Sequence, residues 1–305
     1  MSRSFLEVDD LDPARLAAVL DRAMAWKRDP ALVPRVLEGK GVAALFEKPS
    51  ARTRISVEMA VWTLGGHPIY VRGEEVGLDT RESVEDVART MAGMCTLIAA
   101  RVFDHRVLER MEAVVDVPIV NLLSDRAHPC QALADLLTLC EHFGRLEGLR
   151  VAYVGDGNNV AASLAFGAAL SGVELVVASP EGYELDADVV ARARNLGGTI
   201  DVSGDPYDAV RGVDAVYTDV WTSMGQESER AQRLHAFAGF TVDEALLKVA
   251  SDGAVFLHCL PAHRGEEVEA EVIDGPRSLV WQQAANRMDA VRALLVELVE
   301  EAGRW

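Results

Sequence analysis

Residues 50–54 (Ser-Ala-Arg-Thr-Arg) combine two hydroxyls with two guanidiniums. The preceding run 42–46 (Val-Ala-Ala-Leu-Phe) predicts a buried strand, and the apolar positions of 55–64 fall mostly at helical spacing. Ser50 therefore occupies the position of a helix N-cap, where unpaired backbone N–H groups and the helix dipole attract anions. Arg52 and Arg54 add planar donors that match phosphate oxygens. The segment predicts a phosphate site. The alternative is an arginine-rich helix start capped by Ser50.

Three further clusters of polar and sulfur-containing side chains follow apolar runs later in the chain. They are 128–131 (His-Pro-Cys-Gln), 219–225 (Asp-Val-Trp-Thr-Ser-Met-Gly) and 258–261 (His-Cys-Leu-Pro). Arg101 lies near the end of the apolar run 97–102. Three of these have a structural alternative: a helix-start histidine at 128, an ordinary turn with glycine at 223–225 and a strand-end arginine at 101. Ligands of open α/β sheets bind beyond the carboxyl ends of the strands, so this placement favours function.

Composition narrows the class of protein. The chain has 305 residues, long enough for two domains, and a formal net charge of −18. This charge argues against a nucleic-acid partner and against attraction to an anionic membrane. No apolar run is long enough to span a bilayer, and the first residues lack the apolar core of a signal peptide, so we expect a cytoplasmic protein. The four cysteines share no disulfide-like or metal-like spacing, which predicts reduced thiols.

Strand and helix signals alternate along the whole chain, which predicts parallel sheets covered by helices on both faces. The expected strands are 42–46, 68–71, 97–102 and 118–122, then 150–154, 174–178, 215–218 and 254–258. We therefore predict an α/β fold of two Rossmann-like domains linked by helices, with the active site in the interdomain cleft. The first domain spans 1–143, with the final helix, 287–305, packing back on it. The second spans 148–286.

Residues 155–160 (Gly-Asp-Gly-Asn-Asn-Val) raise a rival hypothesis. They follow a predicted strand and open a predicted helix, as a dinucleotide fingerprint does, which would indicate a nicotinamide oxidoreductase. Val160 stands where the third glycine of that fingerprint belongs, and its bulk disfavours the close packing of helix and strand.

In their order and separation, residues 50–54, 128–131, 219–225 and 258–261 resemble the transcarbamoylases, and the Ser-Met-Gly and His-Cys-Leu-Pro elements resemble the ornithine carbamoyltransferases. The resemblance covers nearly the whole chain. It implies transfer of the carbamoyl group of carbamoyl phosphate to the δ-amine of L-ornithine, which gives L-citrulline and phosphate. It also implies a homotrimer, or a multiple of trimers, and no cofactor.

The resemblance assigns the binding of phosphate to Ser50, Arg52, Thr53 and the backbone of Ala51. Arg101 and His128, together with Thr53, converge on the carbonyl oxygen, where preplaced dipoles would meet the charge that grows in the transition state.

Further contacts of carbamoyl phosphate follow from the same resemblance. Gln131 binds the carbamoyl nitrogen, and Arg287 reaches the carbamoyl oxygen from the start of the last helix. The carbonyls of Cys259 and Leu260 also contact carbamoyl phosphate.

The resemblance places ornithine on the second domain. Asp219 pairs with the α-ammonium, Asn159 holds the α-carboxylate, and Ser223 and Met224 lie on a loop that closes over the substrate. Cys259 faces the δ-amine, and like Arg101, His128 and Arg287 it counts as catalytic, but not as a nucleophile, since the attack is direct.

The chemistry carries two further expectations. The δ-amine must be neutral to attack, and its free pKa resembles that of lysine, so the rate should climb above neutral pH. No metal site is predicted, because His258, Cys259 and His263 lack further ligands at zinc-like spacing.

Several alternatives stay open. The acceptor could be an N-acyl-ornithine, putrescine or aspartate, although residues 221–227 contain no cation to receive a second carboxylate. A non-catalytic relative that only binds ligands is a further class. Three positions depart from the family pattern: Ala51 stands in place of a common Thr, Gly77 near a usual Gln or His, for which Arg72 or Arg81 could substitute, and Ala285 in place of a Glu.

Overall fold

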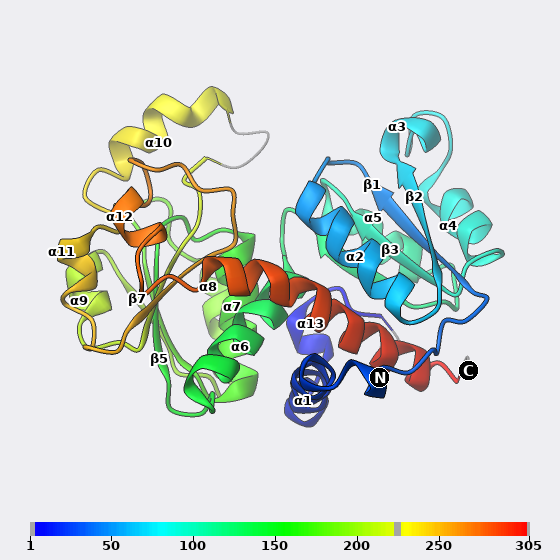
Figure 1. Cartoon of the computed structure of the whole chain (residues 1–305). Helices are drawn as coiled ribbons and strands as arrows, with labels where there is room; N and C mark the ends of the chain where they lie inside the picture. The colour runs from blue at the N-terminus through cyan, green and yellow to red at the C-terminus, as the bar shows by residue number, and fades with distance from the viewer. Residues whose placement is uncertain (1–3, 223–226, 304–305) are drawn as a thin grey trace. The chain divides into compact units, whose positions relative to one another are not determined.

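The computed structural model describes residues 4–222 and 227–303. The chain divides into two compact units, unit 1 (Met1–Leu137 with Ala285–Trp305) and unit 2 (Thr138–Ala284). The chain passes from one unit to the other within α6 (Pro129–Phe143) and returns within α13 (Val280–Glu301). Figure 1 shows the elements of each unit.

The sheet of unit 1 has four parallel strands in the order β2-β1-β3-β4. They are β1 (Gly41–Phe46), β2 (His67–Arg72), β3 (Leu97–Arg101) and β4 (Ile119–Leu123). The register aligns Phe46 with both Arg72 and Arg101, so three strands end at the same edge. Residues that follow these strands therefore lie along one edge of the sheet.

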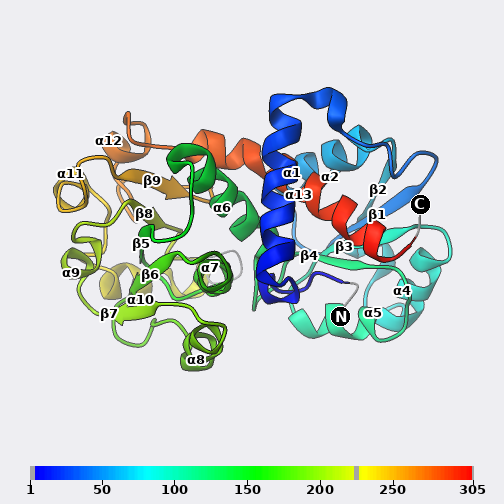
Figure 2. The same cartoon turned by 90° about the horizontal axis from the view of Figure 1, so that it is seen from below.

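The helices of unit 1 cover both faces of this sheet. They are α1 (Pro13–Arg28), α2 (Ala51–Thr63), α3 (Gly73–Val76), α4 (Val84–Ala92) and α5 (His105–Glu112), with short 3₁₀ turns at Val8–Asp10 and Pro30–Leu32. Alternate strand residues such as Leu45 and Ile98 pack in one core cluster with Met91 of α4 and Leu108 of α5. Figure 2 shows α2 on the other side of the sheet.

Unit 2 has five parallel strands in the order β7-β6-β5-β8-β9. They are β5 (Arg150–Val154), β6 (Glu174–Ala178), β7 (Ile200–Ser203), β8 (Ala215–Thr218) and β9 (Val255–His258). The helices are α7 (Asn159–Ser171), α8 (Ala187–Asn195), α9 (Pro206–Val210), α10 (Arg230–Ala236), α11 (Glu244–Leu247) and α12 (Ala270–Ile273), with a 3₁₀ turn at Glu227–Glu229.

The predicted α/β class with two parallel, helix-covered sheets is confirmed. The sequence did not predict β7. This strand lies at the edge of its sheet and reads Ile-Asp-Val-Ser, with Val202 exposed, so the apolar run that marks a buried parallel strand is absent. In the described residues, every helix is too short or too polar to cross a bilayer.

Candidate functional site

Ser50 caps α2, as predicted. Its Oγ accepts a hydrogen bond of 3.3 Å from the backbone N–H of Thr53, and its hydroxyl donates to Thr53 Oγ1 at 3.0 Å. The cap orients the first turn of a 13-residue helix at the carboxyl edge of the sheet. The side chain of Arg52 is half-buried there, and its Nε has no hydrogen-bond partner among the described residues. A buried donor of this kind calls for an acceptor such as an anion.

The Thr53 hydroxyl collects contacts from two distant arginines. Arg287 Nη2, on α13, donates to Thr53 Oγ1 at 2.8 Å, and Arg101 Nη1, at the end of β3, donates to the same oxygen at 3.4 Å. Thr53 and Arg287 are buried. Side chains from α2, β3 and α13 thus converge on one point, the hydroxyl of Thr53.

His128 lies directly before α6 and is buried. Burial, reinforced by the positive charges of Arg287, Arg101 and Arg52, holds the pKa of His128 well below its ordinary value. The imidazole is therefore neutral at neutral pH, so it can donate one hydrogen bond without carrying a charge of its own. The electrostatic coupling links all three predicted arginines to this one histidine.

Lys48 is a cationic residue of this region that sequence reasoning missed. Its ammonium lies 4.4 Å from the centre of the Phe103 ring, and burial together with the charge of Arg101 lowers its pKa. The available signal was its position two residues before Ser50. A lysine in a strand-to-helix loop is common, however, and only the coupling to Arg101 distinguishes it.

The departure at Gly77 has a conformational cause. Gly77 has φ +62°, and a Cβ there would lie 3.0 Å from Arg81 Cβ and Thr80 Oγ1, so another residue would be strained. The two arginines proposed as substitutes are engaged within their own segment: Arg81 Nη1 donates to the Glu75 carbonyl at 3.1 Å, and Arg72 pairs with the Glu75 carboxylate at 3.0 Å.

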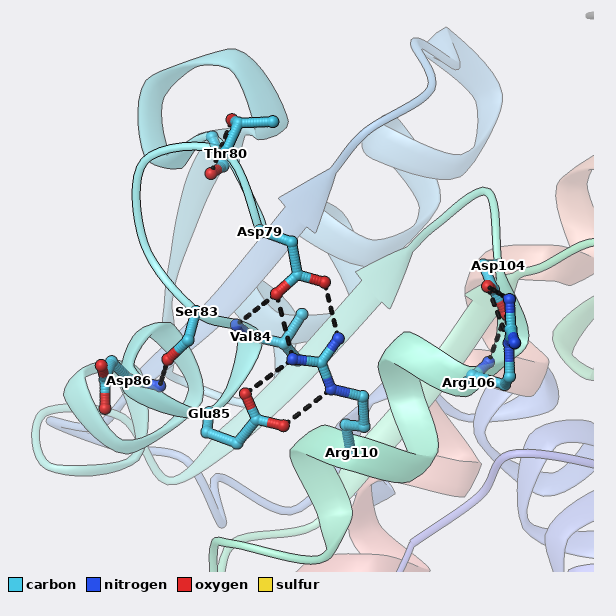
Figure 3. A network of polar contacts seen from close by, with 10 residues as sticks. Asp79, Thr80, Ser83, Val84, Glu85, Asp86, Asp104, Arg106 and Arg110 are labelled. Atoms are coloured by element: carbon cyan, nitrogen blue, oxygen red, sulfur yellow. Dashed lines mark hydrogen bonds and ion pairs between the residues drawn. The ribbon is translucent and has the colours of Figure 1, made fainter.

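Arg110 on α5 forms ion pairs that hold the loop following Gly77. Figure 3 shows Arg110 between Asp79, which has φ +56°, and Glu85 in the first turn of α4. Its nitrogens lie 2.6 Å from Asp79 Oδ2 and 2.7 Å from Glu85 Oε1. The guanidinium lowers the pKa of both carboxyl groups. The loop between residues 77 and 83 is therefore fixed by contacts from a neighbouring helix.

The residues predicted to bind ornithine belong to unit 2, where Asp219 is buried after β8. Asn158 Nδ2 donates to Asp219 Oδ2 and Cys259 Sγ donates to Asp219 Oδ1, each at 2.9 Å. Asn159 is the first residue of α7, and its neighbour Asn158 is the N-cap. Sequence reasoning named Asn159 and missed Asn158, which orients the carboxylate. Ser223 and Met224 lie outside the described residues.

His258 holds the segment that carries Cys259 and Leu260. His258 Nδ1 accepts the N–H of Leu260 at 2.8 Å, so its proton is on Nε2, which contacts Glu267 Oε1 at 3.1 Å. Leu260 has φ +59°, a left-handed conformation that a leucine adopts only when its surroundings enforce it. The imidazole supplies one such contact directly.

Two groups of side chains in the described residues have donors close enough together for a metal ion. One is Asp219, His258 and Cys259, and the other is His263, Glu266 and Glu267. In the first group both ring nitrogens of His258 are already engaged, and the thiol donates to Asp219. These contacts fit a hydrogen-bonded network better than a ligand set.

The nicotinamide hypothesis fails at the glycine that would receive a pyrophosphate. A Cβ on Gly157 would lie 2.3 Å from the backbone nitrogen of Leu185 and 2.4 Å from the carbonyl carbon of Glu184. The Gly157 N–H also donates to the Tyr183 carbonyl at 2.8 Å. The chain's own backbone therefore occupies the space next to Gly157 that the pyrophosphate of a dinucleotide would need.

Comparison with known proteins identifies the family. Residues 3–141 match the model of the carbamoyl-P binding domain of aspartate/ornithine carbamoyltransferase, and residues 147–298 match that of its Asp/Orn binding domain. The chain is 50% identical over 307 residues to ornithine carbamoyltransferase from Acidothermus cellulolyticus, covering 99% of this chain and 98% of that protein.

Solved structures agree. The ornithine carbamoyltransferase of Pyrococcus furiosus is 44% identical with a TM-score of 0.92, covering 97% of this chain and 96% of that one. The Thermus thermophilus enzyme is 47% identical with a TM-score of 0.90, covering 98% and 99%. As its motifs predicted, the chain belongs to the ornithine carbamoyltransferases, within the aspartate/ornithine carbamoyltransferase family.

Proposed function

We propose that this protein transfers the carbamoyl group of carbamoyl phosphate to the δ-amine of L-ornithine, releasing L-citrulline and phosphate. The observation that carries the proposal is the buried set of donors around Thr53. Arg101 and Arg287 both donate to its hydroxyl, and the neutral His128 lies in their field. Concentrated positive charge beside a neutral hydrogen-bond donor suits an anionic acyl phosphate.

Unit 1 binds the donor in this proposal. Ser50, Ala51, Arg52 and Thr53 hold the phosphate at the start of α2, where the backbone N–H groups and the helix dipole favour an anion. Arg101, Arg287 and His128 point N–H groups at the carbonyl oxygen, which gains negative charge as the tetrahedral intermediate forms. Gln131 accepts from the carbamoyl nitrogen.

Unit 2 binds the acceptor. Asp219 pairs with the α-ammonium of ornithine. Asn158 and Cys259 donate to the Asp219 carboxylate and hold it in place. Asn159, Ser223 and Met224 complete the contacts with ornithine. The backbone carbonyls of Cys259 and Leu260 contribute to the binding of carbamoyl phosphate. Residues 221–227 offer no cation for a second carboxylate, which supports ornithine over aspartate.

The reaction needs no covalent enzyme intermediate. The lone pair of the neutral δ-amine attacks the carbonyl carbon, and the carbon–oxygen bond to phosphate then breaks. The departing phosphate takes the proton that the amine gives up, so that hydrogen phosphate is released. The positive charges near Thr53 stabilise both the oxyanion and the leaving group.

We propose a homotrimer, or a multiple of trimers, as the working form. The support is an apolar stripe on α2, formed by Ile55, Met59 and Trp62, whose residues are 61%, 40% and 65% exposed. Large exposed apolar side chains at helical spacing mark an interaction surface. We also propose a cytoplasmic location, which the four free thiols support.

The test is citrulline formation from carbamoyl phosphate with a panel of amines: ornithine, N-acetylornithine, putrescine and aspartate. Ornithine should be the preferred acceptor, and the rate should rise with pH above neutrality. Preference for another amine would transfer the proposal to that substrate. Binding of both ligands without turnover would indicate a non-catalytic relative.

Two variants separate the donor from the acceptor. Arg52→Ala should abolish the use of carbamoyl phosphate, because it removes a guanidinium from the phosphate position. Asp219→Ala should mainly raise the KM for ornithine. Equal effects of both variants on both substrates would contradict the division of roles.

A further inference from the structure

Gln131 and Asp135 form a buried pair on consecutive turns of α6. Gln131 Nε2 donates to Asp135 Oδ1 at 2.7 Å, and the two residues are 1% and 0% exposed. Residues four apart on a helix lie on the same face, so the contact arises within the helix itself. Gln131 also donates its backbone N–H to the carbonyl of His128 at 3.0 Å. The pair is thereby attached to the histidine that the three arginines surround.

The pair determines which way the Gln131 amide faces. Gln131 Nε2 is the atom that donates to Asp135 Oδ1, so the amide turns its NH₂ group toward Asp135 and its oxygen away. That oxygen, Oε1, is buried and has no hydrogen-bond partner among the described residues. An acceptor buried without a partner is costly, and in a native protein it calls for a specific explanation. A donor on a bound ligand is such an explanation.

We propose that Asp135 is a positioning residue that makes the protein selective for acyl phosphates whose acyl carbon carries an NH₂ group. The inference rests on the proposed function and deepens it. The NH₂ of carbamoyl phosphate offers N–H donors to Gln131 Oε1. The methyl group of acetyl phosphate has a similar size but offers none, so shape alone separates the two compounds poorly.

The opposite orientation of the amide would reverse this preference. With its NH₂ group facing the ligand, Gln131 would favour a ligand group that accepts hydrogen bonds and would repel the carbamoyl N–H groups. Asp135 opposes that orientation, because turning Oε1 toward Asp135 would break the 2.7 Å hydrogen bond from Gln131 Nε2 and set two acceptor oxygens against each other. A site built to hydrogen-bond one substituent discriminates strongly against the analogue that lacks it, since its buried polar group is then left unpaired.

The experiment compares carbamoyl phosphate with acetyl phosphate as donors to ornithine, with release of phosphate as the common readout. The wild-type protein should favour carbamoyl phosphate strongly in kcat/KM. Asp135→Asn keeps the shape but allows the amide of Gln131 to turn either way. It should lower the selectivity ratio roughly 10- to 100-fold. Glu141→Gln, which removes a carboxylate from the same helix, should leave the ratio unchanged.

A double-mutant cycle distinguishes positioning from a structural role. Gln131→Met removes the acceptor and should lower the ratio as Asp135→Asn does. In the presence of Gln131→Met, adding Asp135→Asn should change the ratio less than about twofold, because Asp135 acts through Gln131. The proposal would be overturned if Asp135→Asn lowered kcat/KM for carbamoyl phosphate and for acetyl phosphate by the same factor. An effect on the ratio that persists without Gln131 would overturn it as well.

Two complications are resolved by the same set of proteins. Should Asp135→Asn fail to fold, Gln131→Met alone decides. This variant lacks the hydrogen-bond acceptor that Asp135 positions, so an unchanged selectivity ratio would overturn the proposal. Should the wild-type protein make no citrulline, the proposed function fails. The inference is then tested by calorimetric competition, in which carbamoyl phosphate must bind more tightly than acetyl phosphate, and Asp135→Asn must narrow the difference.

Discussion

Arg287 Nη2 lies 2.8 Å from Thr53 Oγ1, although 234 positions separate the two residues in the chain. The contact joins the helix that follows β1 to the last helix of the chain, within unit 1. Arg101 donates to the same oxygen. One hydroxyl therefore holds two of the guanidiniums that we assign to the carbonyl oxygen of carbamoyl phosphate.

Thr53→Val should test this arrangement. Valine keeps the shape of threonine but removes the oxygen that orients Arg101 and Arg287. We expect kcat/KM for carbamoyl phosphate to fall on the order of 100-fold, the usual cost of disturbing an oxyanion-binding donor. Initial rates at saturating ornithine measure this. Thr53→Ser, which keeps the hydroxyl, should retain most of the activity. If valine and serine behave alike, the hydroxyl is not the orienting group.

His128 should make the stability of the protein depend on pH. Its pKa lies well below 6.5 in the folded protein, because of burial and the nearby arginines. The unfolded chain therefore binds a proton first as the pH falls. The free energy of unfolding should be unaffected by this residue above about pH 6.5, and should decrease as the pH falls from there toward the folded pKa.

The measurement is urea denaturation at several values of pH between about 5 and 7.5. His105, whose pKa burial also lowers, contributes in the same direction. His128→Gln should reduce the slope of the unfolding free energy against pH by up to about 1.4 kcal/mol per pH unit. His67→Gln is the matched control, because it removes a histidine from an exposed position. A wild-type slope in His128→Gln would mean that the imidazole is protonated alike in both states.

Glu267 should stabilise unit 2 through His258. The Glu267 carboxylate accepts from His258 Nε2 at 3.1 Å and from the His263 N–H at 2.6 Å, and it is fully buried. Glu267→Gln replaces an acceptor-only group with an amide, which weakens the charge-assisted bonds. We expect a loss of about 1–3 kcal/mol in the free energy of unfolding.

Thermal or urea denaturation checks this value. The matched control is Glu266→Gln, one position away and partly exposed, which should cost less than about 1 kcal/mol. Equal losses in the two variants would show that burial of the carboxylate next to His258 is not the cause.

Trp62 should take part in the assembly of subunits. The wild-type protein should elute with a mass near three times 33.0 kDa, or a multiple of it, in size-exclusion chromatography with light scattering. Trp62→Glu places a charge in the apolar stripe of α2 and should shift the distribution toward monomer. Leu196→Glu, an exposed apolar position on unit 2, serves as the control. An unchanged mass for Trp62→Glu would exclude this stripe from the interface.

Local features of the fold were predictable from the sequence, because they depend on residues close together in the chain. Ser50 caps α2 through a contact only three residues long, and the alternation of apolar runs with helical periodicity indicated two parallel sheets. The exposed edge strand β7 was missed, because burial on both faces produces the apolar run that reveals a parallel strand, and Val202 is not buried.

The resemblance named most of the residues of the candidate site, but not how they hold one another. The resemblance named Asn159 for the α-carboxylate of ornithine and gave no role to its neighbour Asn158. Only the fold shows that Asn158 reaches Asp219, 61 positions away. Likewise, the order of strands brings Arg101 to Thr53, and burial among arginines keeps His128 neutral.

The sequence by itself thus determined the family, the class of fold and where along the chain the candidate site residues stand. Motif order and short-range periodicity depend only on neighbours in the chain. The tertiary structure alone decided the contact of Arg287 with Thr53, the proton position on His258 and the neutrality of His128. Such properties depend on strand order, register and burial, which join residues far apart in the chain and set the local dielectric around them.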